Sequence, residues 1–229
     1  MKIDALGDSA LIINLADEIS DSTRLLARVL SAAETIEGAK LPGVVDVTSS
    51  YESVAVFFDL PQVERDIEAK IGALIASAGV RVSGKKQRVE IPVCYDEEFA
   101  LDLDRVANHT SLTPDAIIAL HSSAEYTVAC IGFMPGFPFL AGLPQQLCVP
   151  RLESPRTKVP SGSVAIANAQ AGVYPLESPG GWNVLGRTPL QLFRVNESPP
   201  TLLRPGDCVQ FRRITRAEFE AADMCPFFS

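Results

Sequence analysis

The residues best suited to chemistry lie in one stretch of the chain, residues 121–189. It sets aromatic, arginine and histidine side chains among glycines and prolines, as in Gly-Phe-Met-Pro-Gly-Phe and Ser-Pro-Gly-Gly-Trp. Glycine permits a positive φ or a close backbone approach, and proline fixes φ. The pattern therefore predicts stiff, closely apposed loops, which on a rigid scaffold commonly carry binding and catalytic groups.

Two residues of this stretch are candidates for a direct catalytic role. His121 ends a predicted helix five residues before Tyr126, and its imidazole could move a proton at the mouth of a barrel. The alternative is structural, because a histidine at a helix C-terminus is favoured by the helix dipole. Arg187 lies in a loop bounded by glycine and proline, where it could hold a carboxylate or a developing negative charge. The other histidine, His109, is expected on a helix surface.

A second group of candidates could bind a substrate or a partner. Its aromatic members stand beside glycine or proline, and they either line a cleft, plug the barrel or form a hot spot for a partner. Arg156 follows a proline, as a rigid carboxylate clamp requires, although a solvated arginine is the alternative. The group comprises Tyr126, Phe133, Phe137, Arg156, Ser163, Tyr174, Ser178, Trp182 and Asn183.

Residues 132–147 contain no charged side chain. An acidic chain would rarely leave such a run uncovered, and stable interfaces exclude charge from their centres. We therefore expect a partner to pack on this run and on Trp182. The competing interpretation is that the run folds inward and fills the end of the barrel.

Composition excludes several classes of protein. The net charge of −8 argues against nucleic acid as a partner. No apolar run approaches the length of a membrane span, and the N-terminus lacks the apolar core of a signal peptide. The five cysteines form no C-x-x-C pair, which argues against zinc and for reduced thiols in a cytoplasm. No metal-ligand spacing, nucleophile motif or nucleotide fingerprint is present.

Charge is unevenly distributed along the chain. Residues 126–206 hold six basic and three acidic side chains, although the chain as a whole is acidic. A locally basic region suits a small anionic substrate or an acidic partner. Chance scatter of exposed arginines is the alternative.

Hydrophobic periodicity predicts an α+β two-layer domain over residues 1–86. The pattern is a split βαβ sandwich, with helices on one face of an antiparallel sheet. One helix is expected from the Ser20–Ser22 region to Gly38, and another from Pro61 to Gly79. Strands are expected at residues 2–6, 10–15, 44–48 and 54–58.

An all-β barrel domain is expected over residues 87–229, after a polar linker at residues 83–87. A half-buried strand at 88–94 precedes two short helices, the second capped by Thr113. Short apolar runs between turns then predict a closed or nearly closed barrel. These runs are 126–131, 146–149, 164–167, 190–195 and 207–214.

Taken together, these motifs resemble the family formed by the B subunits of bacterial 5-oxoprolinase, also known as the KipI or allophanate hydrolase subunit 1 family. The resemblance covers the whole chain. Two positions depart from the family pattern: Ala171 replaces a usual threonine, and Asn183 replaces a usual arginine or glutamine. The carrying motifs are Gly-Asp-Ser-Ala-Leu (7–11), His121 with Tyr126, Gly-Phe-Met-Pro-Gly-Phe (132–137), Pro-Arg (155–156), Val-Pro-Ser-Gly-Ser-Val (159–164), Gln-Ala-Gly-Val-Tyr-Pro (170–175), Ser-Pro-Gly-Gly-Trp (178–182), Gly-Arg-Thr-Pro (186–189) and Pro-Gly-Asp (205–207).

The resemblance implies a cyclophilin-like barrel of the carboxyltransferase type in the C-terminal half. It also implies one component of an ATP-dependent complex that opens 5-oxoproline to glutamate together with its sister A and C subunits. ATP would act through the assembled complex, and this chain alone would be inactive. Two alternatives remain: an inhibitor of a sensor histidine kinase, or a carboxyltransferase-type component of a urea or allophanate amidolyase system.

Overall fold

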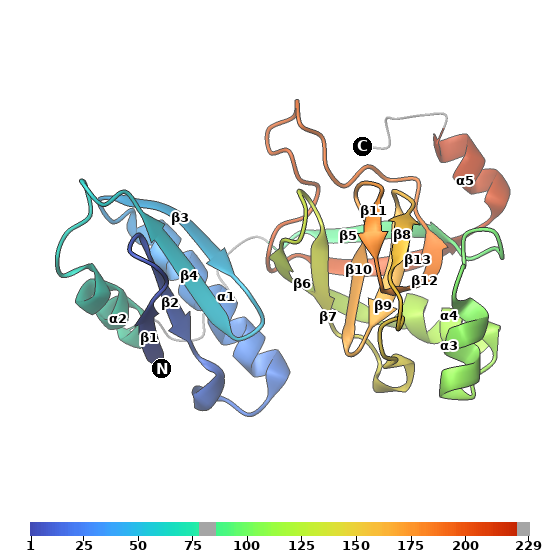
Figure 1. The fold of residues 1–229 in the computed structure, drawn as a ribbon, viewed down its shortest axis with the longest axis horizontal. Helices are drawn as coiled ribbons and strands as arrows, with labels where there is room; N and C mark the ends of the chain where they lie inside the picture. Colours follow the sequence, from blue (N-terminus) through green and yellow to red (C-terminus); the bar gives the residue numbers. More distant parts are fainter. Residues whose placement is uncertain (78–85, 224–229) are drawn as a thin grey trace. The chain divides into compact units, whose positions relative to one another are not determined.

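The computed structural model describes residues 1–77 and 86–223. The chain divides into two compact units, Met1–Lys86 and Gln87–Ser229, which Figure 1 colours from blue to red along the sequence. Gly79, most of the predicted linker and Cys225 lie outside the described residues.

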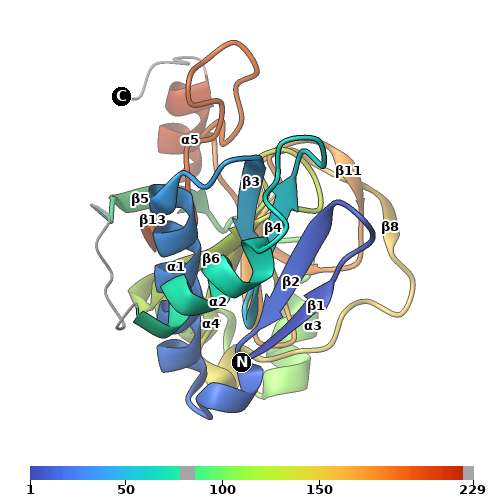
Figure 2. The same ribbon diagram turned by 90° about the vertical axis from the view of Figure 1, so that its left-hand side faces the viewer.

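The N-terminal unit has two layers. The sheet runs in the order β1-β2-β4-β3, with every neighbouring pair antiparallel. Helices α1 and α2 lie against one face of it, as Figure 2 shows. Strands β2 and β3 are joined through α1 and have β4 inserted between them, which is the predicted split βαβ unit. The elements are β1 (Lys2–Ala5), β2 (Ala10–Asn14), a 3-10 turn (Ala16–Glu18), α1 (Ser22–Ala39), β3 (Val44–Ser49), β4 (Ser53–Phe58) and α2 (Ile67–Ser77).

Asp21 caps α1 as predicted, because its carboxylate accepts from the Arg24 amide at 2.7 Å. The helix runs past the expected stop at Gly38 to Ala39, and Lys40 follows as its C-cap with φ of 49°. The second helix begins later than predicted. Pro61 does not open a helix. The turn around it is tied to the start of β3 instead, where the Asp59 amide donates to the Gly43 carbonyl at 2.8 Å.

The C-terminal unit is a closed barrel with strand order β10-β7-β6-β13-β5-β12-β9, which confirms the predicted barrel. Strands β5 and β13 pair in parallel, and the other pairs are antiparallel. Val128, Leu140 and Leu185 lie in its interior and are fully buried. The barrel strands are β5 (Arg88–Cys94), β6 (Glu125–Ile131), β7 (Pro138–Ala141), β9 (Ser163–Ala167), β10 (Gln170–Val173), β12 (Asn183–Arg187) and β13 (Cys208–Ile214).

Two of the predicted strands are absent. Residues 146–149 form a 3-10 turn (Gln145–Leu147) and an isolated bridge, and residues 190–195 form a loop with another isolated bridge. Within the motif-rich region, the predicted strands at 126–131 and 164–167 are present as β6 and β9. The glycine- and proline-rich segments also supply β7, β10 and β12, which the apolar runs did not predict, together with a two-stranded sheet outside the barrel, β8 (Arg156–Val159) and β11 (Ser178–Gly180). Proline opens β7 at Pro138, a strand position that tolerates its missing N–H.

Three helices pack around the barrel. Helix α3 (Leu103–Thr110) contacts β12, α4 (Pro114–Ser123) contacts β13, and α5 (Arg216–Asp223) contacts β5. Thr113 caps α4 as predicted, accepting from the Ala116 amide at 3.3 Å. His109 is exposed on α3. Within residues 1–77 and 86–223, no helix is long and apolar enough to cross a membrane.

His121 is buried where α4 packs on the barrel. Its ring is fully buried and stacks on Phe211, with centroids 4.5 Å apart. Its Nδ1 lies 2.8 Å from the Tyr95 hydroxyl, and the Tyr126 hydroxyl donates to its backbone carbonyl at 3.0 Å. Burial lowers the pKa of His121 to about 3. The ring is therefore neutral and has no access to solvent. Its role as a proton carrier at the barrel mouth stays a prediction.

The burial of neutral His121 predicts an acid-sensitive fold. Between its ordinary pKa of 6.5 and about 3, only the unfolded chain binds a proton at this residue. The free energy of unfolding therefore falls as pH falls, by up to about 1.4 kcal/mol per pH unit. His121→Phe keeps a stacked ring without a titrating group, so we expect a shallower decline in urea unfolding measured across this range. His109→Gln is the control, and equal pH slopes for wild type and His121→Phe contradict the prediction.

The two units are predicted to fold separately. The larger core clusters each fall wholly inside one unit: the sheet–helix core spans residues 11–75, and the barrel core spans residues 89–211. A fragment of residues 87–229 is expected to be soluble and to unfold cooperatively, followed by circular dichroism and by Trp182 fluorescence. A molten or insoluble fragment would show that the barrel needs the N-terminal unit.

Candidate functional site

A second apolar cluster lies on the outer face of the barrel wall. Along β9, Val164 and Ile166 belong to the barrel core, whereas Ala165 and Ala167 belong to this separate cluster. Successive strand residues point to opposite faces, so the second cluster is outside the barrel. Val159 of the two-stranded β8–β11 sheet also belongs to the cluster. The site expected at one end of the barrel is therefore on its side.

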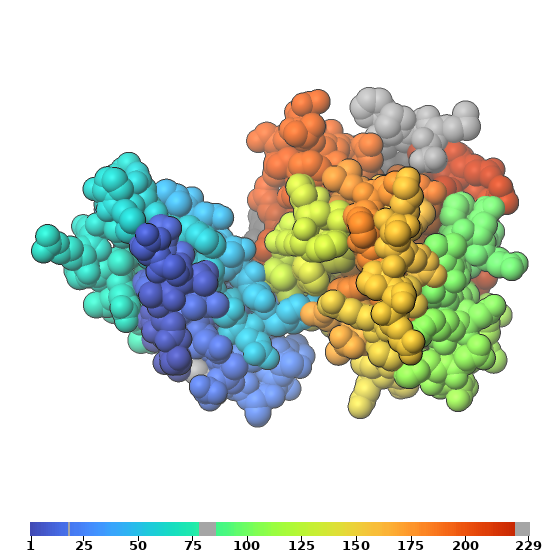
Figure 3. Space-filling view, in the orientation of Figure 1, coloured from blue at the N-terminus to red at the C-terminus, as the bar shows by residue number. Residues whose placement is uncertain are grey.

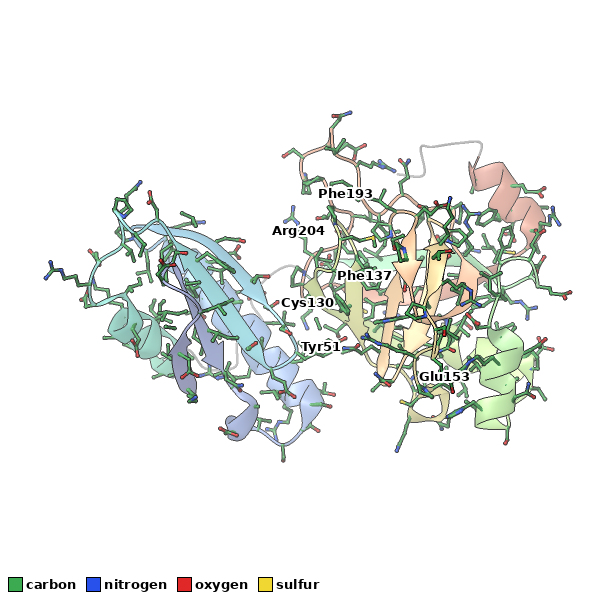
Figure 4. The ribbon with its side chains drawn as sticks, viewed as in Figure 1. Tyr51, Cys130, Phe137, Glu153, Phe193 and Arg204 are labelled. Atoms are coloured by element: carbon green, nitrogen blue, oxygen red, sulfur yellow. The ribbon has the colours of Figure 1, made fainter. Side chains whose placement is uncertain are left out.

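Aromatic rings form the centre of this outer cluster. Phe137 lies edge-to-face against Tyr174, with centroids 5.2 Å apart, and against Trp182, at 5.6 Å. Phe133 contacts Phe137 at 5.5 Å and stays 65% exposed, with a positive φ of 68°. Edge-to-face pairs are favourable beyond their buried area, so the rings hold one another in place. The structure thus brings four predicted residues together; Figure 4 labels Phe137 among them.

The aromatic cluster borders a hollow of about 280 Å³, which we call the aromatic hollow. In Figure 3 the yellow-green segment after β6 adjoins the gold and orange segments of β8 and β11 on the face turned to the viewer. The lining residues are Phe133, Phe137, Phe139, Arg151, Pro155, Tyr174, Pro179, Gly180, Gly181 and Trp182.

Two glycines permit this packing. A Cβ on Gly172 would lie 2.8 Å from the ring of Phe137, and one on Gly180 would collide with the hydroxyl of Tyr174. Burial raises the pKa of Tyr174, while a hydrogen bond with the Trp182 backbone and the charges of Arg151 and Arg156 oppose that rise. The phenol therefore stays neutral, fixed against the backbone at the start of β12.

Arg156 is engaged by the protein itself. Its two terminal nitrogens donate to the two carboxylate oxygens of Asp102, at 2.8 and 2.7 Å. Asp102 is 4% exposed and also accepts from the Val184 amide at 2.7 Å. A bidentate pair of this kind occupies the two nitrogens with which the guanidinium would otherwise hold a substrate carboxylate. The geometry therefore assigns Arg156 to anchoring the two-stranded β8–β11 sheet, and its role as a clamp stays a prediction.

Arg187 and Ser163 lie elsewhere on the barrel. They face each other across β12 and β9, at the opposite end of β12 from Trp182. The Nε of Arg187 donates to the Ser161 carbonyl at 2.7 Å, and its guanidinium lies over Phe219. Ser163 is buried. Neither residue lines the aromatic hollow.

The remaining predicted residues do not line the aromatic hollow, and their binding roles stay predictions. Asn183 is fully buried, and its amide nitrogen donates to the carbonyls of Pro150 and Ile166, at 3.0 and 3.2 Å. Tyr126 is fully buried beside His121. Ser178 lies on β11, where its hydroxyl donates to the Pro179 carbonyl. The two departures from the family pattern, Ala171 and Asn183, are both buried away from the aromatic hollow.

The uncharged run at residues 132–147 mostly folds inward. Phe137 joins the outer cluster, and Leu140, Leu143 and Leu147 join the barrel core. Phe133 alone presents a large exposed apolar surface in this run. Trp182, the other residue of the expected interface, is only 6% exposed. The interface expected here is therefore reduced to Phe133 and its surroundings, and the hot-spot role of Trp182 stays a prediction.

The three phenylalanines of residues 132–139 were expected to line a cleft or to plug the barrel end, and Phe139 lines the aromatic hollow with the other two. Two residues of the site are absent from the sequence-based prediction. Arg151 had only its charge as a signal. Asp102 gave no signal, because its partner Arg156 is 54 positions away in the chain.

Two further features bear on function. A larger hollow of about 570 Å³ lies between β5, β13, α5 and the loop before β13, and it is lined by Leu190, Leu202 and Ile214 among others. No group of three His, Cys, Asp or Glu side chains in the described part of the chain is arranged to hold a metal ion.

Comparison with known proteins identifies relatives of the whole chain. Residues 1–203 match the family model of the carboxyltransferase domain, subdomain C and D. The B subunit of 5-oxoprolinase from Bacillus subtilis is 42% identical over 235 residues, covering 96% of this chain and 95% of that protein.

Solved structures share the fold. The crystal structure of TTHA0988 superposes with a TM-score of 0.77 at 35% identity, over 90% of this chain and 40% of that longer one. The urea carboxylase of Kluyveromyces lactis superposes with a TM-score of 0.77 over 98% of this chain and 23% of that one, and its 19% identity supports the fold alone. The fold, the family model and the full-length relatives agree: this chain belongs to the carboxyltransferase subdomain C and D family, in the branch formed by the B subunits of 5-oxoprolinase.

Proposed function

We propose that this chain is the B subunit of an ATP-dependent 5-oxoprolinase complex, which opens 5-oxoproline to L-glutamate together with the A and C subunits in the cytoplasm. The observation that carries the proposal is the match to the Bacillus subtilis B subunit, which spans 96% of this chain and both of its units. A relative that shared only the barrel would support the fold and little more.

The aromatic hollow supports a component that binds and does not act alone. Its lining holds one cation and five aromatic rings, with no carboxylate, histidine, serine or cysteine. Opening a lactam adds water across a C–N bond and needs groups that activate the water and protonate the nitrogen. In this proposal the partner proteins supply those groups, and ATP acts through the assembled complex.

Two alternatives have one observation each in their favour. The family model is that of a carboxyltransferase domain, which favours carboxyl transfer in a urea or allophanate amidolyase system. The exposed ring of Phe133 favours a docking module, such as an inhibitor of a sensor histidine kinase. Reconstitution of the complex separates both from 5-oxoprolinase.

Reconstitution tests the proposal directly. The chain alone is expected to release no glutamate from 5-oxoproline with ATP, whereas the mixture with the A and C subunits is expected to release it in proportion to ATP hydrolysed. The same mixture without this chain is the control. Substantial turnover by this chain alone contradicts the proposal that the partner proteins supply the catalytic groups. An inactive complete mixture contradicts the proposed function.

The two predicted catalytic residues are testable in the same complex. The exposed part of Arg187 leaves its guanidinium available to a substrate or a partner, so Arg187→Gln is expected to lower turnover, by about 100-fold or more if it stabilises developing charge. The melting temperature of the Arg187→Gln variant should change little, because the Arg187 side chain is outside the core clusters.

His121→Gln separates the two roles of the histidine. Its burial predicts a lower melting temperature with turnover retained in the folded fraction. A loss of about 100- to 10,000-fold in turnover without a loss of stability would instead support proton transfer.

A further inference from the structure

Arg151 is the only charged residue that lines the aromatic hollow. Its guanidinium carbon lies 5.9 Å from the centroid of the Trp182 ring, in a cation–π arrangement. The side chain is exposed, and no carboxylate pairs with it within residues 1–77 and 86–223. An arginine held over an aromatic face keeps its donor fork free for a planar anion.

The backbone on both sides of Arg151 is anchored. The Pro150 carbonyl accepts from the Asn183 amide nitrogen at 3.0 Å, and the Leu152 amide donates to the Gly181 carbonyl at 2.8 Å. Both bonds tie the segment to the residues that flank Trp182. The position of Arg151 over the ring is therefore built into the fold, and little freedom is lost when an anion binds there.

The neighbouring cations are already paired. Arg156 is held by Asp102 at 2.7 Å, and Lys158 by Glu177 at 3.1 Å. Of the three basic residues in this segment, Arg151 alone is left for a ligand within the described residues. A ligand that complements this site therefore carries a negative charge to pair with Arg151. It also has an apolar part that contacts the aromatic rings.

The size of the aromatic hollow limits the ligand. At about 280 Å³ it lies just below the range for small-molecule sites, roughly 300–1,000 Å³. Rigid ring contacts around Phe137 leave it little room to expand. A compact ring with one carboxylate satisfies the volume, the aromatic walls and the single cation together.

We propose that the aromatic hollow binds a small cyclic carboxylate, with Arg151 pairing the carboxylate and the accessible parts of the lining rings, Phe133, Phe139 and Trp182, contacting the ring. This assignment rests on the proposed function in one respect, the choice of 5-oxoproline as that ligand. Arg151 is then a substrate-binding residue, and it determines specificity for the carboxylate.

Arg151→Gln in the assembled complex tests the assignment. Loss of a charged hydrogen-bonding pair is expected to raise the KM for 5-oxoproline about 10- to 100-fold, with a smaller effect on kcat. Arg204→Gln is the matched control, because Arg204 is exposed in the same unit and lines none of the hollows described. An unchanged KM for Arg151→Gln overturns the proposal.

Ligand binding by the full chain separates this proposal from the proposed function. Trp182 is the only tryptophan, so its fluorescence reports the aromatic hollow directly. We expect saturable changes with 5-oxoproline and with cyclopentanecarboxylate, and binding at least about 10-fold weaker for 2-pyrrolidinone, which lacks the carboxylate. Arg151→Gln should abolish the preference for the carboxylates over 2-pyrrolidinone, and Arg204→Gln should keep that preference.

The outcomes are distinct. If the reconstituted complex is inactive but Arg151-dependent binding of cyclic carboxylates persists, the aromatic hollow is a carboxylate site and the proposed function is wrong. If the complex turns over 5-oxoproline with an unchanged KM in Arg151→Gln, the function stands and the site assignment falls. Equal binding of 2-pyrrolidinone and 5-oxoproline also overturns the assignment.

Discussion

The buried carboxylate of Asp102 is the constraint on which the site depends. It joins three segments that are distant in sequence: the start of α3, Arg156 of β8 and the Val184 amide of β12. A carboxylate that is 4% exposed must be paired and hydrogen-bonded, because an unpaired buried charge is costly. Strands β8 and β11 pair only with each other within the described residues, and a sheet of only two strands is marginally stable in water. The ion pair therefore fixes the two-stranded sheet that bounds the aromatic hollow.

The barrel wall itself supplies both a core and a site. Its strands place Val164, Ile166 and Leu140 inside, and Ala165, Ala167 and Phe139 outside. Small outward residues leave room for rings to pack on the wall, and Gly172 lets Phe137 approach the backbone. The same alternation that closes the barrel thus gives the aromatic rings a rigid base.

Sequence reasoning succeeded where local patterns were decisive. Periodicity and caps predicted α1, α4 and the closed barrel, and aromatic residues beside glycine and proline predicted the cluster of Phe137, Tyr174 and Trp182. It failed where long-range contacts decide. His121 has the sequence context of a helix end, but its burial against Phe211 depends on how α4 meets β13. Likewise, only the fold reveals that Asp102 occupies Arg156 and leaves Arg151 free.

In the proposed complex, the position of Phe133 would couple assembly to ligand binding. Its ring borders the aromatic hollow and is 65% exposed, so a partner protein seated over it would cover the hollow as well. Covering the hollow removes water from around Arg151, and a charge pair strengthens as the surrounding dielectric falls. A cyclic carboxylate would then bind more tightly in the complex than in the free chain. The catalytic groups that the hollow lacks would arrive with the same partner, so water would be excluded from the substrate at the step that assembles the chemistry.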